Sequence, residues 1–187
     1  YLPYNAPHDP LQAPHQLIDW YERTGELTGS VARIYAMIES MDAGIGRLRE
    51  TLETLDLLED TLVVFTSDNG PAMGGEGDAC VDRYNGPFSG TKYDVLEGGI
   101  RVPAIVQWPA GLPSGSRCDA LVHFTYWLPT LYRLTGHLLP EGLSLDGNDV
   151  MPLLRGEQGS ETWARYWQWN QYEPVAHANA AMREGKG

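Results

Sequence analysis

Apolar side chains recur at spacings of three and four along residues 30–55. The series consists of Ile34, Ile38, Met41, Ile45, Leu48, Leu52 and Leu55. On an α-helix this spacing places them in one stripe, and the charged residues between them lie mostly off that stripe. The pattern therefore predicts a long amphipathic helix over residues 30–55.

A different pattern follows at residues 61–67, where the chain is continuously apolar and rich in β-branched and aromatic residues. A run of this length is typical of a strand. Because a strand that is apolar on both faces needs cover on both sides, we expect it in a parallel sheet. A helix followed by a strand is half of such an α/β unit.

The rest of the chain predicts shorter elements. Residues 1–27 contain four prolines, which favours an irregular segment. Residues 70–101 are rich in glycine and without periodicity, which is typical of a long functional loop. Further elements are expected as a strand at 103–108, a short helix at 128–134 ended by Gly136, a helical turn at 150–154, and a hairpin of 163–169 with 176–183.

Composition and net charge indicate which kinds of binding partner the protein can have. The 187 residues are 42% hydrophobic and 20% charged, as in an ordinary soluble globular domain. A net charge of −12 argues against nucleic acid or an anionic membrane as the main partner. No run is long enough to span a membrane, and no signal peptide is recognisable. The two cysteines, Cys80 and Cys118, can form one disulfide or remain as two thiols, and the sequence is compatible with both.

Polar chemistry begins where the strand at residues 61–67 should end. Asp68 and Asn69 stand there, and Gly70 with Pro71 breaks the strand. Ligands of open α/β sheets bind beyond the carboxyl ends of the strands. Carboxylate and amide oxygens suit Ca²⁺ or Mg²⁺ better than Zn²⁺. Taken alone the motif is better explained as an Asn-Gly turn, but the rest of the chain favours a metal site.

Two further side chains are candidates for binding an anion. His8 lies in a loop that Pro7 and Pro10 stiffen, and stiff loops can aim a polar group. Lys92 lies in the glycine-rich segment, which can return it to Asp68 and Asn69. Without context, each would be interpreted as a surface residue.

Several separated stretches together resemble the sulfatase family. In chain order they are 6–10, 41–46, 66–70, 90–92, 97–103, 108–111, 128–131, 146–147 and 181–183. Each motif is weak alone, but the ordered set is specific and covers nearly the whole chain.

This resemblance implies an alkaline-phosphatase-like α/β fold, with an incomplete sheet and flanking helices in residues 1–156. Residues 157–187 would begin a small antiparallel C-terminal subdomain. It also implies hydrolysis of sulfate esters by a formylglycine made from a Cys-X-Pro-X-Arg motif. Neither Cys80 nor Cys118 matches that motif, so the chain resembles the C-terminal part of a sulfatase and is expected to be inactive alone. A smaller departure is Tyr126, where the family often has Asp.

The resemblance also implies roles for the candidate residues. Asp68 and Asn69 resemble ligands of a single Ca²⁺, with Mg²⁺ as the alternative. Lys92 and His8 resemble catalytic groups that bind the sulfate, and either can be the general acid. The expected partner is a sulfated small molecule or a carbohydrate. A periplasmic or secreted location agrees with the family.

Two alternatives stay open. One is a phosphoester or phosphonate hydrolase of the same superfamily, against which Asn69 argues because the zinc-binding branch resembles Asp-His at this place. The other is a catalytically inactive remnant that binds anions. A Cys-X-Pro-Ser/Ala-Arg motif upstream would support the enzyme, and its absence would support the remnant.

Overall fold

The computed structural model describes residues 1–24, 27, 29–72, 84–157, 163–170 and 179–184. Two compact units divide the chain, Tyr1–Trp108 and Pro109–Gly187. The first holds α1 (His15–Arg23), α2 (Gly29–Thr54), β1 (Val63–Thr66), α3 (Glu97–Ile100) and β2 (Ala104–Gln107). The second holds η2 (Phe124–Tyr126), α4 (Trp127–Leu134), α5 (Met151–Leu154), β3 (Arg165–Trp169) and β4 (Asn179–Arg183). The division expected from the sequence, at 156/157, stays a prediction.

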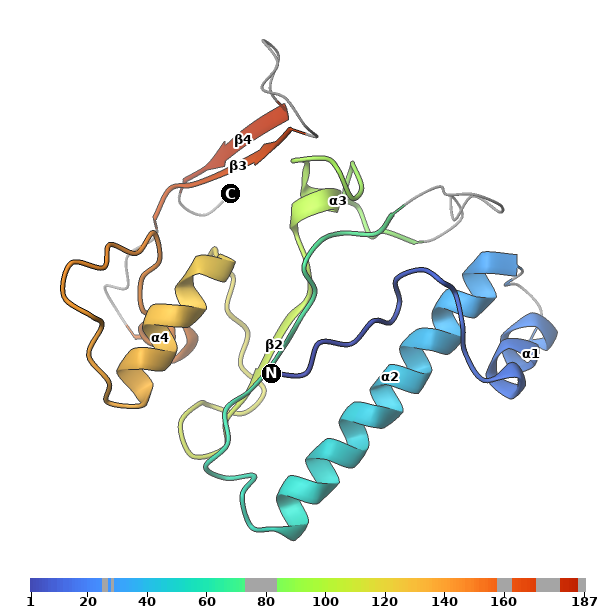
Figure 1. Ribbon diagram of the computed structural model, residues 1–187, viewed down its shortest axis with the longest axis horizontal. Coiled ribbons are helices and arrows are strands. Elements are labelled where there is room, and N and C mark those ends of the chain that lie inside the picture. Colours follow the sequence, from blue (N-terminus) through green and yellow to red (C-terminus); the bar gives the residue numbers. More distant parts are fainter. Residues whose placement is uncertain (25–26, 28, 73–83, 158–162, 171–178, 185–187) are drawn as a thin grey trace. The chain divides into compact units, whose positions relative to one another are not determined.

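The long amphipathic helix is confirmed as α2, and its N-terminal half carries much of the core. Its buried residues are Val31, Ala32, Ile34, Ala36 and Met37. Helix α1 packs against α2 (Figure 1). The Tyr21 ring centroid lies 5.9 Å from that of Tyr35, and the Tyr21 hydroxyl donates to Glu39 at 2.8 Å. Helix α1 therefore contacts the first turns of α2 through Tyr35 and Glu39, which lie off the predicted stripe.

Helix α1 corrects the expectation that residues 1–27 are irregular. All four prolines precede it, and Pro14 stands at its N-cap. Proline is tolerated at a helix start because the first amide groups have no intrahelical partner. The Pro14 carbonyl accepts from the amides of Leu17 and Ile18 at 3.0 and 3.2 Å. The prolines therefore predicted the irregular conformation of residues 1–14 correctly, but residues 15–23 are helical.

Strands β1 and β2 form at the two predicted places, but their pairing is antiparallel. Val63 lies opposite Gln107, and Thr66 lies opposite Ala104. A parallel neighbour, as expected for residues 61–67, is not among the described strands. Parallel neighbours need a crossover helix, whereas the described part of this connection holds only the single turn α3. In β1 itself Val63, Val64 and Phe65 are only half-buried, so the cover expected on both faces of this strand is incomplete in the described structure.

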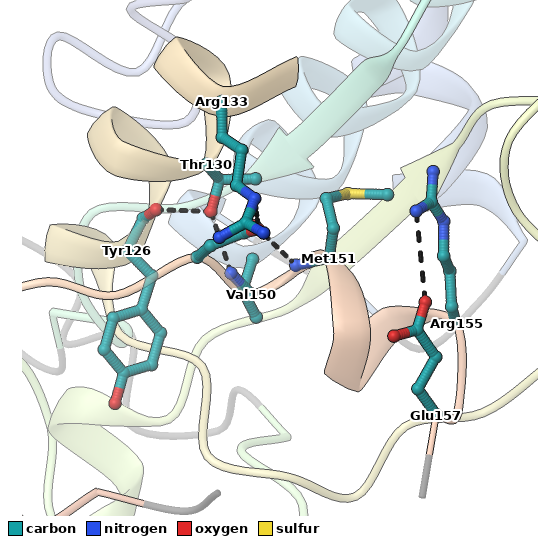
Figure 2. Close-up of polar contacts among 8 residues, drawn as sticks. Tyr126, Thr130, Arg133, Val150, Met151, Arg155 and Glu157 are labelled. Atoms are coloured by element: carbon teal, nitrogen blue, oxygen red, sulfur yellow. Dashed lines mark hydrogen bonds and ion pairs between the residues drawn. The ribbon is translucent and has the colours of Figure 1, made fainter. Parts of the chain in front are cut away.

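The second unit is organised around the buried hydroxyl of Thr130. It donates to the Tyr126 carbonyl at 2.6 Å and accepts from the Val150 amide at 2.9 Å (Figure 2). The Arg133 guanidinium pairs with the Asp149 carboxylate at 3.3 Å. These contacts join α4 to the chain that enters α5, and both helical segments match the sequence prediction.

The predicted hairpin is confirmed by β3 and β4, which pair antiparallel from Arg165↔Arg183 to Trp169↔Asn179. Tyr126 is fully buried beside it. The Arg165 guanidinium carbon lies 4.4 Å from the Tyr126 ring centroid, and the Trp163 ring lies 5.4 Å from it. The tyrosine at this position is thus accommodated by aromatic and cation–π packing.

Cys118 is a free and exposed thiol, whereas Cys80 lies outside the described residues. Within the described part of the chain, none of the helices has the length and apolarity needed to cross a membrane.

Candidate functional site

Asp68 and Asn69 follow β1 after one intervening residue, Ser67, because the strand ends at Thr66. Asp68 is exposed and Asn69 is half-buried. The Asn69 Nδ2 donates to the Gly70 carbonyl at 2.8 Å, and the Ser67 hydroxyl donates to the Asn69 carbonyl at 3.1 Å. Because a carbonyl only accepts, the first bond sets the orientation of the amide and presents Oδ1 as a ligand atom.

Four glycines lie where the segment that carries Asp68 and Asn69 packs against the glycine-rich segment. They are Gly70, Gly90, Gly98 and Gly99. The Gly70 amide donates to the Gly99 carbonyl at 2.8 Å. A Cβ atom on Gly70 would collide with the Gly98 carbonyl oxygen, and one on Gly98 would collide with that of Gly90. Only glycine allows such close backbone approach, so part of the predicted loop is tightly packed.

Lys92 is returned to the same place by its main chain. Its amide donates to the Pro71 carbonyl at 2.9 Å, which joins it to the segment that carries Asp68 and Asn69. A turn over residues 91–94 holds it there. The Asp94 amide donates to the Thr91 carbonyl at 2.9 Å, and the Asp94 carboxylate accepts from the Thr91 amide at 2.9 Å.

The two charges of these neighbouring segments are not neutralised by other side chains. Among the residues that the structure describes, neither the Lys92 ammonium nor the Asp68 carboxylate belongs to an ion pair. The Lys92 Nζ lies 5.6 Å from the Tyr93 ring centroid. An unpaired ammonium can bind an anion, and an unpaired carboxylate can bind a metal cation.

His8 is exposed, and its hydrogen bonds are made within its own loop. Its amide donates to the Asn5 carbonyl at 2.8 Å, and its Nδ1 lies 3.0 Å from the Asp9 carbonyl oxygen. Since that oxygen only accepts, Nδ1 carries a proton, and Nε2 of the neutral ring has the lone pair. No contact within the described ranges joins His8 to Lys92 or Asp68. The structure thus groups three of the four predicted site residues.

Within the described residues, Asp68 and Asn69 would supply only part of the ligand shell of a metal ion. No group of three or more His, Cys, Asp or Glu side chains converges in the described regions. Ca²⁺ takes about six to eight oxygen ligands, so other donors have to complete the shell. The two residues fit as hard oxygen donors, one of them anionic.

Sequence reasoning missed two residues of the turn at 91–94. The carboxylate of Asp94 closes the turn by accepting from the Thr91 amide. Tyr93 has a backbone φ of 81°, a value that residues other than glycine rarely adopt. An aspartate three residues after Thr91 was the available signal for the first. No local signal marks the second.

Comparison with known proteins identifies the family of the chain. The family model described as Sulfatase matches residues 1–137. Steryl-sulfatase of Mus musculus is 42% identical over 123 residues, which are 64% of this chain and 20% of that protein. The uncharacterized sulfatase YdeN of Escherichia coli (strain K12) is 31% identical over 184 residues, which are 94% of this chain and 31% of that protein.

A solved structure is similar over nearly the whole chain. The crystal structure of Ps i-CgsB in complex with k-i-k-neocarrahexaose has a TM-score of 0.83 and 30% identity, and the match covers 98% of this chain and 38% of that one. The chain thus spans 20% and 31% of the two curated relatives. The family model matches residues 1–137, which is more than half of the chain, and this match shows that the chain belongs to the sulfatase family.

Proposed function

We propose that the protein to which these residues belong hydrolyses sulfate esters. The observation that carries this proposal is the pair of un-neutralised charges on two hydrogen-bonded segments. Lys92 supplies a cation for the sulfate, and Asp68 supplies an anionic ligand for a metal. Membership in the sulfatase family and the similarity to steryl-sulfatase support the same activity.

In this proposal Asp68 and Asn69 hold one Ca²⁺, with Mg²⁺ as the alternative. The donor set supports a hard cation because it contains oxygen and no thiolate or imidazole. When bound, the metal polarises a sulfate oxygen and the hydroxyl of the nucleophile. The formylglycine that supplies this hydroxyl is expected in residues outside the present sequence, since neither Cys80 nor Cys118 has the required motif.

Lys92 is the main sulfate-binding residue in the proposal. Its ammonium offsets the charge on the non-bridging oxygens and can give a proton to the leaving oxygen. His8 is the second candidate for the general acid. Because the Nδ1–H of His8 donates to the Asp9 carbonyl, His8 can donate a proton to a substrate only from a protonated Nε2. An ester with a strongly activated leaving group needs no acid, so a His8 variant should retain activity on it if His8 is the general acid, whereas a Lys92 variant loses its charge stabilisation on any ester.

The substrate is proposed to be a sulfated small molecule or a carbohydrate. The similarity to steryl-sulfatase supports the first, and the solved structure that contains k-i-k-neocarrahexaose supports the second. Both bring a ring system to the sulfate.

Assays of the intact protein test the activity. We expect it to release 4-nitrophenol from 4-nitrophenyl sulfate at a rate well above that from 4-nitrophenyl phosphate. The 187-residue chain alone should release none above a blank. A preference for the phosphate would support a phosphoester hydrolase. Inactivity on both esters would support a remnant.

A further inference from the structure

Tyr93 occupies a position in the 91–94 turn where an aromatic residue is conformationally unfavourable. It is the third residue of this turn, with a φ of 81°. This value is typical of the third position of a type II turn, which glycine or asparagine usually occupies. Its side chain is 58% exposed, so burial of the ring does not offset the strain.

The turn is held rigidly on both sides of Tyr93. The Asp94 carboxylate accepts from the Thr91 amide at 2.9 Å, and the Lys92 amide donates to the Pro71 carbonyl at 2.9 Å. The ring is therefore projected from a backbone whose conformation its neighbours determine. Residues kept in strained conformations cluster at functional sites, which makes this ring a candidate for a role in binding.

The distance between Lys92 and Tyr93 indicates what the ring can contact. The Lys92 Nζ lies 5.6 Å from the Tyr93 ring centroid. A sulfate oxygen bound by this ammonium would lie about 2.8 Å from Nζ. From a non-bridging oxygen, the carbon that carries the ester is two S–O bonds and one O–C bond further. An organic ring at that carbon can reach the range of about 4.5–7 Å between centroids in which aromatic rings stack.

We propose that Tyr93 is a specificity-determining residue that stacks on the ring bearing the sulfate group. The ligand is a flat apolar ring face, either an arene or the C–H face of a pyranose. Acyclic alkyl sulfates lack this contact and are bound through the sulfate alone. This inference rests on the proposed sulfatase function of Lys92 and adds the selection of the organic part of the substrate.

The test compares Tyr93→Gly and Tyr93→Phe with the wild type in the intact protein. Glycine suits the turn and removes the ring, whereas phenylalanine retains the ring. Initial rates of sulfate release are measured with 4-nitrophenyl sulfate, galactose 4-sulfate and hexyl sulfate. Each variant is compared with wild type on the same ester, so differences in intrinsic reactivity cancel. Trp20→Ala is the control, because Trp20 is 53% exposed on α1 of the same unit.

For Tyr93→Gly we expect the KM of ring-bearing esters to rise about five- to tenfold with little change in kcat, while hexyl sulfate is unaffected. Tyr93→Phe and Trp20→Ala should behave as wild type. A rise for only one of the two ring-bearing esters supports stacking and identifies the ring as an arene or a pyranose. The intact Tyr93→Gly protein should melt no lower than wild type.

An equal effect of Tyr93→Gly on all three esters would overturn this inference and leave the proposed function intact. A clearly lower melting temperature would also overturn it, because the ring would then be a packing anchor. Wild-type protein that is inactive on every ester would overturn the proposed function, and this inference with it.

Discussion

The main-chain amide of Lys92 donates a hydrogen bond to the carbonyl oxygen of Pro71 at 2.9 Å. This bond joins a lysine of the glycine-rich segment to the turn that follows β1, although 20 positions separate the two residues. It involves only backbone atoms, so substitutions of the Lys92 side chain leave it in place. The charge of Lys92 can therefore be tested without disrupting the connection between the two segments.

Lys92→Ala in the intact protein should lower kcat/KM for 4-nitrophenyl sulfate by about a hundredfold or more, since one charge stabiliser is lost. Steady-state kinetics measure the effect. Arg49→Ala is the matched control, because it removes an exposed cation from α2 and should leave the rate unchanged. A loss below threefold for Lys92→Ala would contradict the sulfate-binding role.

Asp68→Ala in the intact protein should abolish metal binding and activity together, because one anionic ligand and part of the charge balance disappear. Elemental analysis and calorimetric titration with Ca²⁺ measure the metal. Asp42→Ala removes an exposed carboxylate from α2 and should retain the wild-type metal content. Stoichiometric zinc in the wild-type protein would contradict the hard-cation site.

Gly98→Ala should destabilise the 187-residue chain, because its Cβ would collide with the Gly90 carbonyl and lie 2.7 Å from the Ser89 carbonyl oxygen. Overpacking against backbone typically costs about 1–3 kcal/mol. Gly46→Ala is the control, since its Cβ would meet nothing within 4 Å on α2. That change should stabilise the helix by about 0.5–1 kcal/mol. Urea unfolding of both variants checks the opposite signs.

Acidification should weaken the second unit through His123. Burial, and secondarily the nearby charge of Arg165, lower the pKa of His123 from its ordinary 6.5. The unfolded chain then binds the proton more readily than the folded chain. The stability contributed by neutral His123 is thus fully present above about pH 6.5 and is lost as pH falls through the folded pKa.

Local contacts explain why the folded state favours the neutral ring of His123. Its Nδ1 accepts from the Thr125 amide at 3.3 Å, and its ring lies 5.5 Å from that of Trp167. Protonation of Nδ1 would remove this acceptor. His123→Asn retains an acceptor for the Thr125 amide without titrating, so its urea midpoint should depend less on pH between 5 and 7 than that of wild type. His137→Asn controls for loss of a histidine, and an unchanged slope in His123→Asn would contradict the assignment.

Local patterns were sufficient for much of the secondary structure. The three- and four-residue spacing from Ile34 onward predicted α2 because helix faces depend on neighbours within a turn. The apolar run of residues 61–67 and the aromatic run of residues 163–169 likewise predicted β1 and β3. Asp68 and Asn69 were selected from their place after a predicted strand, whereas Lys92 and His8 gained their roles from the resemblance to a family.

Long-range contacts decided the rest. The antiparallel pairing of Val63 with Gln107 depends on the path of the chain between the strands, which periodicity does not encode. From the sequence, Gly70 and Gly98 are interpreted as ordinary loop residues. The structure shows that a backbone carbonyl oxygen lies where the Cβ atom of each would be. Tyr93 adopts a φ of 81° although its own preference opposes it, because bonds from Thr91, Asp94 and Pro71 hold the turn. Local preference sets the elements, whereas backbone contacts between distant segments determine which side chains meet.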